Sequence, residues 1–458
     1  MMRDLRTRLR GELERLPFGT AVGFLLKGPA QVFAVRVFGA GLAYASLVLL
    51  ARWLGSFQFG IYAYVSVIVM LLGIAMSFGF NASGLRFVST YRARNKRARL
   101  AGFIVQSYKL VLLLSTVGAL AAAGLVLLLR REIPDYYLAP LLIGLCCVPF
   151  WSLLNQLEST ARAFGWLTLA YIPNYILRPF LLLTGVGIVL LTVGSADATT
   201  ALRVLIVACA TAVAVQAAVI YRRIRPLLSG QRPATHTRYW MAVSLGFLAI
   251  DGLRMLLENA DVLLIGQLLD PHSVAVYYAV IRTGGLLGFI SFSVTALAVP
   301  RFAQIHSTGS PRELQDFVTS TIRAIFWPTL LAAFALALLG KFVLALFGPG
   351  FDAGYPTLLV VLCGLVLRAA SSPVEYLLTM TGHHRDTIEV YAGAAVATVI
   401  LNLVLIQAFG LIGAAAASYL AIIGANVCLY LRVRSRLGVN ACIFAQAIPS
   451  RKILAARS

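Results

Sequence analysis

Nine ionisable side chains lie inside long apolar runs of this 458-residue sequence, where composition alone would exclude them. They are five arginines and four acids: Arg36, Arg178, Arg254, Arg282 and Arg368, with Asp251, Glu258, Asp261 and Glu375. Near the centre of a membrane helix each costs about 2.5 to 3.5 kcal/mol, so nine facing lipid would oppose insertion by roughly 20 to 30 kcal/mol. We therefore expect most of them to face one another or a water-filled cavity.

Four of these residues form a stripe along one apolar run. Asp251, Arg254, Glu258 and Asp261 fall within an arc of about 80° on a helix. Arg254 and Glu258 are also spaced for an i to i+4 ion pair. The stripe predicts either a structural ladder of ion pairs or the wall of a cavity used in transport, and the two are compatible. The acids, with Glu375, are candidates for ion coupling or for charge balance.

The arginines suit an anionic substrate, because a guanidinium stays charged and binds phosphate oxygens with two parallel hydrogen bonds. By helix rise, Arg178 and Arg254 lie roughly 18 to 21 Å from the cytoplasmic ends of their runs, too deep for easy snorkelling. They are the first candidates for substrate contact. Arg36 lies only about 9 Å from its end. For Arg36, Arg282 and Arg368, substrate contact and structural ion pairing both stay open.

The elements that must position these residues are membrane helices. Hydrophobic residues make up 60% of the chain, charged ones 12%, and the mean hydropathy is +0.86, far from the balance of a soluble domain. Each apolar run is long enough to cross about 30 Å of hydrocarbon as a helix. We predict twelve spans: 30–51, 58–80, 103–129, 137–156, 166–191, 202–221, 240–268, 274–298, 322–347, 354–380, 388–408 and 411–431. Pro173 and Pro179 are expected to kink the fifth.

The distribution of positive charge predicts the orientation. Lys and Arg gather in the N-terminus, in the 81–100 and 222–239 loops and in the C-terminal tail, all on one side of twelve spans. Since such loops are retained in the cytoplasm, both termini should be cytoplasmic. The net charge of +22 is spread along the membrane boundary, which favours anionic phospholipids and not nucleic acid as its partner. Leucines at helical spacing among the arginines of residues 1–29 predict an amphipathic surface helix.

The two halves of the sequence echo each other. A shift of 215 positions lays Tyr62 on Tyr277 and Arg86 on Arg301, without a gap. This predicts an all-α polytopic membrane protein with two pseudo-symmetric lobes of six helices and a substrate path between them. The expected divisions are a basic N-terminus (1–29), an N-terminal lobe (30–221), a basic linker (222–239), a C-terminal lobe (240–431) and a basic tail (432–458).

Short motifs along residues 30–436 resemble one known family. They are Arg36 to Gly39, Ala51 to Ala63, Asn259 to Gly266, Tyr277 to Ala279, Leu346 to Phe351 and Gly410 to Ala417. In order and spacing they are similar to bacterial polysaccharide flippases of the multidrug, oligosaccharidyl-lipid and polysaccharide exporter superfamily. The resemblance implies transport of an undecaprenyl-linked glycan from the inner to the outer leaflet of the bacterial inner membrane. A polysaccharide polymerase and glycosyltransferases are then the expected partners.

Two other classes of function remain as alternatives. A multidrug or cation antiporter of the same superfamily would favour acidic groups in the N-terminal lobe, whereas the first span offers Arg36 and no carboxylate. A membrane-embedded glycan assembly enzyme would need a large external loop, and loops such as 269–273 and 348–353 are short. No Walker loop, metal-ligand cluster or hydrolytic triad stands out. We therefore expect no enzyme activity, metal or cofactor, and transport driven by the membrane potential or by a proton or sodium gradient.

Overall fold

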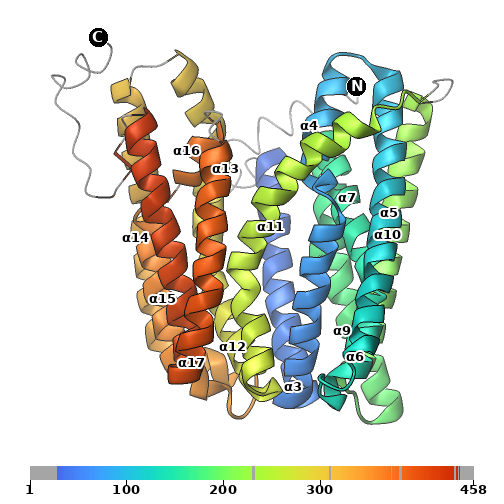
Figure 1. The fold of residues 1–458 in the computed structure, drawn as a ribbon, viewed down its shortest axis with the longest axis vertical. Helices are drawn as coiled ribbons and strands as arrows, with labels where there is room; N and C mark the ends of the chain where they lie inside the picture. The colour runs from blue at the N-terminus through green and yellow to red at the C-terminus, as the bar shows by residue number, and fades with distance from the viewer. Residues whose placement is uncertain are drawn as a thin grey trace, which may run out of the picture.

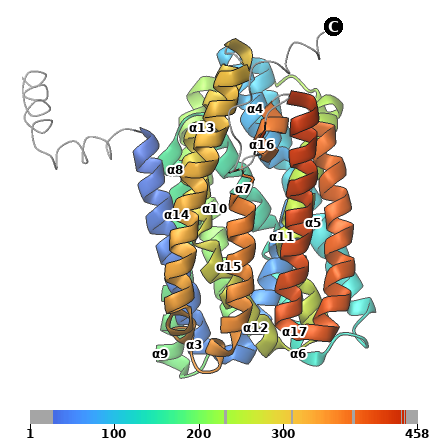
Figure 2. The ribbon, with the colours of Figure 1, turned by 90° about the vertical axis from the view of Figure 1, so that its left-hand side faces the viewer.

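The protein is a bundle of long helices that run nearly parallel to one another (Figures 1 and 2). The computed structural model describes residues 28–228, 233–308, 311–372, 374–380, 384–437, 440, 441 and 443, and no strand occurs among them. The predicted amphipathic helix in residues 1–29 and most of the predicted tail lie outside these residues. Leu120, Leu191 and Phe342 are among many large apolar side chains on the outer surface, as expected where lipid is the solvent.

Two groups of helices form the two lobes. The first holds α3 (Gly28–Met76), α4 (Phe80–Ala93), α5 (Arg97–Leu128), α6 (Asp135–Leu145), α7 (Val148–Ala163), α8 (Leu167–Ile172), η1 (Pro173–Leu177), α9 (Arg178–Val193) and α10 (Ala198–Leu228). The second holds α11 (Thr237–Leu268), α12 (Pro271–Gly285), α13 (Gly288–Thr308), α14 (Pro311–Ala345), η2 (Phe351–Gly354), α15 (Tyr355–Ala369), α16 (Val374–Met380) and α17 (His384–Leu437).

The spans follow the sequence prediction closely. Nine helices among the described residues are long and apolar enough to cross a membrane, and the bent pair α6 and α7 makes a tenth span. The long helices α3 and α17 each consist of two helices that meet at a glycine with positive φ, Gly55 (74°) and Gly410 (58°). Only glycine adopts such angles without strain. Dividing both helices there brings the described spans to twelve.

The internal repeat is visible in the helix boundaries. The second half of α3 starts after Gly55, and α12 starts at Pro271 after Asp270, a shift of 215 positions. The same shift carries the end of α5 at Leu128 to position 343, two residues before α14 ends at Ala345. The two lobes are therefore structural repeats of each other, as parallel six-helix repeats should be.

Helix α11 packs on both lobes. Near its start, Trp240 donates a hydrogen bond to the Tyr91 hydroxyl at 2.9 Å, and the Ser244 hydroxyl contacts the Ser83 hydroxyl at 2.6 Å. Further along, α11 packs against α17 of the second lobe, and Leu257 belongs to that lobe's core. Figure 1 shows α11 crossing obliquely from one lobe to the other.

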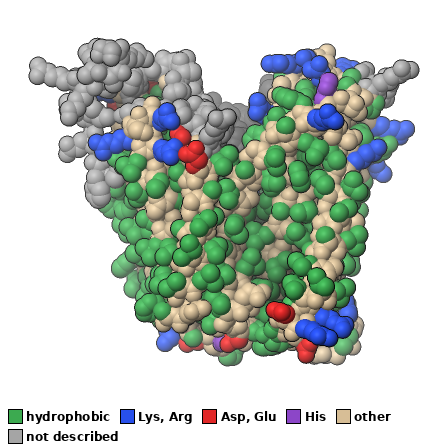
Figure 3. Space-filling view, in the orientation of Figure 1, with side chains coloured by type: hydrophobic (Ala, Val, Ile, Leu, Met, Phe, Trp, Pro, Cys, Tyr) green, Lys and Arg blue, Asp and Glu red, His purple; other side chains and the backbone are tan. Residues whose placement is uncertain are grey.

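The lobes are joined at one end and separate at the other. At the end that carries the described termini of α3 and α17, each lobe has its own apolar core, one around Phe103 and one around Phe302. At the opposite end a single core contains α3 and α12 side chains, such as Val65 and Tyr277. Lys and Arg gather mainly at the separated end (Figure 3). The bundle is thus open toward its basic end.

Close contacts seal the joined end. Tyr44 of α3 and Thr283 of α12 share a hydrogen bond of 2.8 Å, and Gln267 of α11 donates one of 2.6 Å to the Tyr64 hydroxyl. Gly60 lies so near the Pro271 carbonyl oxygen that an added Cβ would stand 1.7 Å from it. The absence of a side chain at Gly60 is what lets the lobes meet here.

Candidate functional site

A cavity of about 700 Å³ lies between the two lobes. Its first wall comes from α3, α7 and the region of η1 and α9, and its second from α11, α12, α13, α14, α15, α16 and α17. Its polar and aromatic lining includes Tyr44, Trp151, Asn174, Tyr175 and Arg178 on one side, and Glu258, Asn259, Asp261, Arg282, Phe292, Arg368, Glu375, Ser418 and Tyr419 on the other. This volume is in the range of sites that hold small ligands or head groups.

A π-helical turn in the fifth span directs the side chains of one wall into the cavity. The sequence predicted kinks at Pro173 and Pro179, and the structure has a π-helical turn over Pro173–Leu177 that connects α8 to α9. Such a turn inserts extra backbone into a helix and changes which side chains face a neighbour. As a result, Asn174, Tyr175 and Arg178 all line the cavity.

Helix ends position two arginines of the second lobe. The predicted eighth and tenth spans are each broken: α12 ends at Gly285 and α15 at Ala369. Arg282 and Arg368 lie in the last turns of these helices. The carbonyl groups at a helix C-terminus carry partial negative charge, so a cation in the last turn is stabilised. The helix ends inside these broken spans thus offset part of the energetic cost of placing an arginine inside the membrane.

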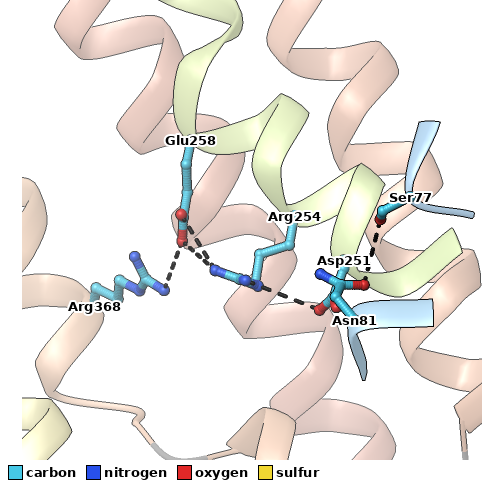
Figure 4. Close-up of polar contacts among 6 residues, drawn as sticks. All are labelled: Ser77, Asn81, Asp251, Arg254, Glu258 and Arg368. Carbon is cyan, nitrogen blue, oxygen red and sulfur yellow. Dashed lines mark hydrogen bonds and ion pairs between the residues drawn. The ribbon is translucent and has the colours of Figure 1, made fainter. Parts of the chain in front are cut away.

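Glu258 connects two arginines. Its carboxylate lies 3.3 Å from Nη1 of Arg254, the ion pair expected from their spacing, and 3.8 Å from Nη2 of Arg368 on α15 (Figure 4). Arg254 also lies 3.9 Å from Asp251. The sequence could give only the contacts within α11. The bridge to Arg368 depends on how α15 packs.

Three other arginines rest on aromatic rings. The guanidinium of Arg178 lies 4.4 Å from the ring centre of Trp151, and that of Arg282 lies 4.5 Å from that of Tyr278. Arg36 is held between Tyr171 at 4.4 Å and Phe292 at 4.2 Å, one ring from each lobe. Within the described residues, no ion pair joins Arg36, Arg178 or Arg282 to a carboxylate. A cation–π contact keeps a guanidinium in place without neutralising it.

Asp261 is the most deeply buried acid of the cavity wall. Only 3% of the residue is exposed, and its carboxylate accepts hydrogen bonds from the Tyr277 hydroxyl at 2.6 Å and from the backbone NH of Val262 at 2.8 Å. Tyr277 is the repeat partner of Tyr62. Such bonds offset part of the cost of burying a carboxylate.

The cavity gathers six of the nine residues singled out from the sequence. Arg178, Arg282, Arg368, Glu258, Asp261 and Glu375 line it. Arg36, Asp251 and Arg254 do not. Arg36 lies behind Tyr175 and Phe292, which do line the cavity, and Arg254 and Asp251 adjoin Glu258 on α11. Which of these side chains contact substrate stays a prediction.

The sequence analysis missed one acid close to the cavity. Glu158 of α7 has a side chain only 12% exposed, and it accepts a hydrogen bond of 3.0 Å from Asn174. The predicted fourth span stopped at residue 156, whereas α7 continues to Ala163. Residues 157–164 contain neither Gly nor Pro, and this was the signal that could have extended the helix to Gly165.

Two arginines of the cavity wall offer guanidinium groups that an anion could bind. Glu258 is shared by two arginines and Asp261 is held by Tyr277, while the guanidinium groups of Arg178 and Arg282 keep their charge. Nη1 of Arg178 is buried without a hydrogen-bond partner. A phosphate oxygen would satisfy such a donor.

Comparison with known proteins gives both a family and a fold. The profile of a family described as "Polysaccharide biosynthesis protein" matches residues 25–306, more than half of the chain. No curated protein sequence matches significantly.

Among solved structures, similarity is high over nearly the whole bundle despite low sequence identity. An inward-facing multidrug resistance MATE family transporter of the MOP superfamily aligns with a TM-score of 0.70 and 14% identity, over 89% of this chain and 94% of that one. The lipid II flippase MurJ, in an inward closed conformation, aligns with 0.66 and 15%, over 88% and 87%. A eukaryotic MATE transporter aligns with 0.66 and 14%, over 89% and 94%. These likenesses establish the two-lobe fold.

Proposed function

Because the chain belongs to the family of polysaccharide biosynthesis proteins, we propose that it is a flippase that moves a lipid-linked oligosaccharide across the bacterial inner membrane. The observation that carries this proposal is the central cavity between the lobes, where Arg178 and Arg282 face the space without carboxylate partners among the described residues. An anionic head group is the chemical class that such a wall attracts.

The lipid pyrophosphate of an undecaprenyl-linked glycan fits this chemistry. Arg178 projects from the first lobe and Arg282 from the second, so a pyrophosphate between them would be held by both lobes. Its oxygens accept the guanidinium hydrogen bonds, and the aromatic rings beneath the cations keep their planes in position. Glycosyltransferases would supply the finished glycan, and a polymerase would use it after transport.

The basic, open end is the cytoplasmic one under this proposal. Lys and Arg gather there, as retention of positive loops in the cytoplasm requires, and both termini are then cytoplasmic. The open bundle is the state that loads substrate from the inner leaflet. Rocking of the two repeats against each other would close this end and open the sealed one.

The membrane potential is a sufficient driving force for an anion. An interior-negative potential pushes negative charge outward with roughly 2.3 kcal/mol per elementary charge per 100 mV. In this account Glu258, Asp261, Asp251 and Glu375 limit the positive charge of the empty cavity. Coupling to a proton or sodium gradient through one of these acids is the competing account.

A cation or multidrug antiporter is the second candidate, and one observation favours it. Glu158 places a nearly buried carboxylate beside Asn174 of the cavity wall in the first lobe, where an antiporter would need an acid. Uptake of a fluorescent cationic drug by proteoliposomes, with and without a proton gradient, tests this candidate directly.

Reconstitution tests the main proposal. Purified protein would be placed in vesicles with the host's own lipid-linked oligosaccharide, and the fraction exposed on each leaflet followed with a membrane-impermeant glycosidase. We expect transfer between leaflets that empty vesicles lack. In cells, deletion of the gene should trap finished glycan on the inner leaflet. Truncated glycan after deletion would instead point to an assembly enzyme.

A further inference from the structure

A second pocket lies at the sealed end of the bundle, far from the basic opening. It has a volume of about 600 Å³. One wall is the turn inside α3, and the other is the loop between α14 and η2 together with the start of η2. We call it the exit pocket, defined by Ala51, Arg52, Gly55, Ser56, Ala345, Phe347, Gly348, Pro349, Phe351 and Asp352.

The wall of the exit pocket contacts the wall of the central cavity through a pair of aromatic rings. Tyr44 lines the central cavity and Phe347 lines the exit pocket. Their rings meet edge to face, with centres 5.5 Å apart, and Tyr44 is fixed by its hydrogen bond to Thr283. Because Tyr44 belongs to one lobe and Phe347 to the other, a movement that parts the lobes here would break this contact.

The backbone of the loop shapes the second wall. Gly348 has a φ of 130° and Gly350 one of 84°, on either side of Pro349. Side chains rarely tolerate these angles. Across the seam, Nε of Arg52 donates a hydrogen bond of 2.5 Å to the Leu346 carbonyl oxygen, which ties the arginine to the opposite wall of the pocket.

The polar groups of the exit pocket are chemically mixed. Arg52 can only donate hydrogen bonds, the Asp352 carboxylate can only accept them, and the Ser56 hydroxyl does both. No ion pair joins Arg52 to Asp352 in the described part of the chain. A free phosphate would suit Arg52 but would be repelled by Asp352. A sugar hydroxyl donates and accepts, so a hydroxyl-rich ligand satisfies all three groups. Phe347 and Phe351 add an apolar floor.

We propose that the exit pocket is a subsite for the sugar portion of the glycan on the non-cytoplasmic side of the membrane. The identity of the ligand rests on the proposed function, whereas the site itself rests on the pocket and its side chains. The pocket lies between the two lobes at that end, so a glycan that emerged between them would meet it.

Protection of an engineered thiol tests the subsite. Ala345→Cys places a thiol at an exposed position of the pocket lining and replaces none of the three polar groups. This protein, in vesicles of phosphatidylethanolamine and phosphatidylglycerol, is labelled with a membrane-impermeant maleimide, and the parent protein gives the background of native cysteines. The probe is the oligosaccharide released by mild acid from the host's lipid-linked glycan. At about five times its Kd, a bound sugar should slow labelling about sixfold. Ser195→Cys, in an exposed loop at the same end, should label at an unchanged rate.

Matched charge variants identify the recognising groups. In the Ala345→Cys protein, Arg52→Gln and Asp352→Asn should each abolish protection, whereas Arg130→Gln, a cation at the same end outside the pocket, should preserve it. Absence of protection, or protection that Arg52→Gln and Asp352→Asn leave intact, would overturn the subsite. So would labelling that responds to phosphatidylglycerol content and not to oligosaccharide.

Leaflet transfer measured on the same vesicles separates the two proposals. Transfer without protection leaves the flippase and removes the subsite. Protection without transfer leaves a sugar site on a protein that is not a flippase.

Discussion

Arg178→Gln is the most informative change in the central cavity. The guanidinium of Arg178 lies on Trp151, its Nη1 has no hydrogen-bond partner, and no carboxylate pairs with it among the described residues. Glutamine removes the charge and the two-pronged donor and leaves a polar side chain of moderate length. If Arg178 binds the pyrophosphate, the change removes interactions with substrate and few interactions within the protein.

The expected magnitude follows from the kind of bond lost. A hydrogen bond to a charged group contributes about 1.5 to 3 kcal/mol. Loss of about 1.5 to 3 kcal/mol corresponds to a roughly 10- to 150-fold weaker apparent affinity. Arg178→Lys should recover part of this loss, because it restores the charge without the planar fork.

Thermal stability distinguishes binding from a structural role. Removing one partner of a buried ion pair costs about 3 to 5 kcal/mol, because the other charge is left uncompensated. Arg178 leaves no such partner behind, so Arg178→Gln should not lower the melting temperature. By contrast, Glu258→Gln leaves Arg254 and Arg368 without their shared carboxylate and should destabilise the protein.

The assay is the initial rate of leaflet transfer in proteoliposomes over a range of substrate concentrations. Arg203→Gln is the matched control, since Arg203 is exposed on α10 of the same lobe and outside the cavity lining. Unchanged transport in Arg178→Gln at equal protein levels, or an equal loss in Arg203→Gln, would refute the assignment of Arg178 to substrate binding.

Three further predictions concern the transport cycle. Reporters fused after Lys96 should be cytoplasmic and reporters near Asp270 external; the reverse would invert the orientation. Gly60→Val should hold the lobes apart at the sealed end, because a Cβ at this position would stand 1.7 Å from the Pro271 carbonyl oxygen. Transport should then fall, and labelling of a thiol at that end should rise. Unchanged labelling would contradict this. A potassium-diffusion potential, negative on the loading side, should drive transfer without any ion gradient. Dependence on a proton gradient that Glu258→Gln removes would replace this electrophoretic account.

How far the sequence predicts the site can be judged from α11. The spacing of Arg254 and Glu258 alone predicted their ion pair, because residues four apart on a helix are always neighbours. The same holds for the spans, since runs of about 20 apolar residues must become helices in lipid. The shift of 215 positions that lays Tyr62 on Tyr277 likewise predicted the structural repeat, because segments of similar sequence adopt similar structures.

Contacts between distant helices were decided only by packing. Nothing in the local pattern pairs Arg368 with Glu258, or separates Arg178, which lines the cavity, from Arg254, which does not. The turn Pro173–Leu177 became π-helical and thereby changed which side chains face the cavity. Helix α7 continued past the predicted span and placed Glu158 beside the cavity wall.

The sequence by itself therefore predicted that lipid surrounds this protein, where its helices lie, and that its two halves are repeats. It also identified the charged residues inside the membrane spans, which need a compensating group. The tertiary structure alone decided which charges are neutralised and which stay available to a ligand. The physical reason is range: helix formation and insertion depend on neighbours within about one or two turns, whereas compensation of a buried charge depends on whatever side chain another helix brings to it.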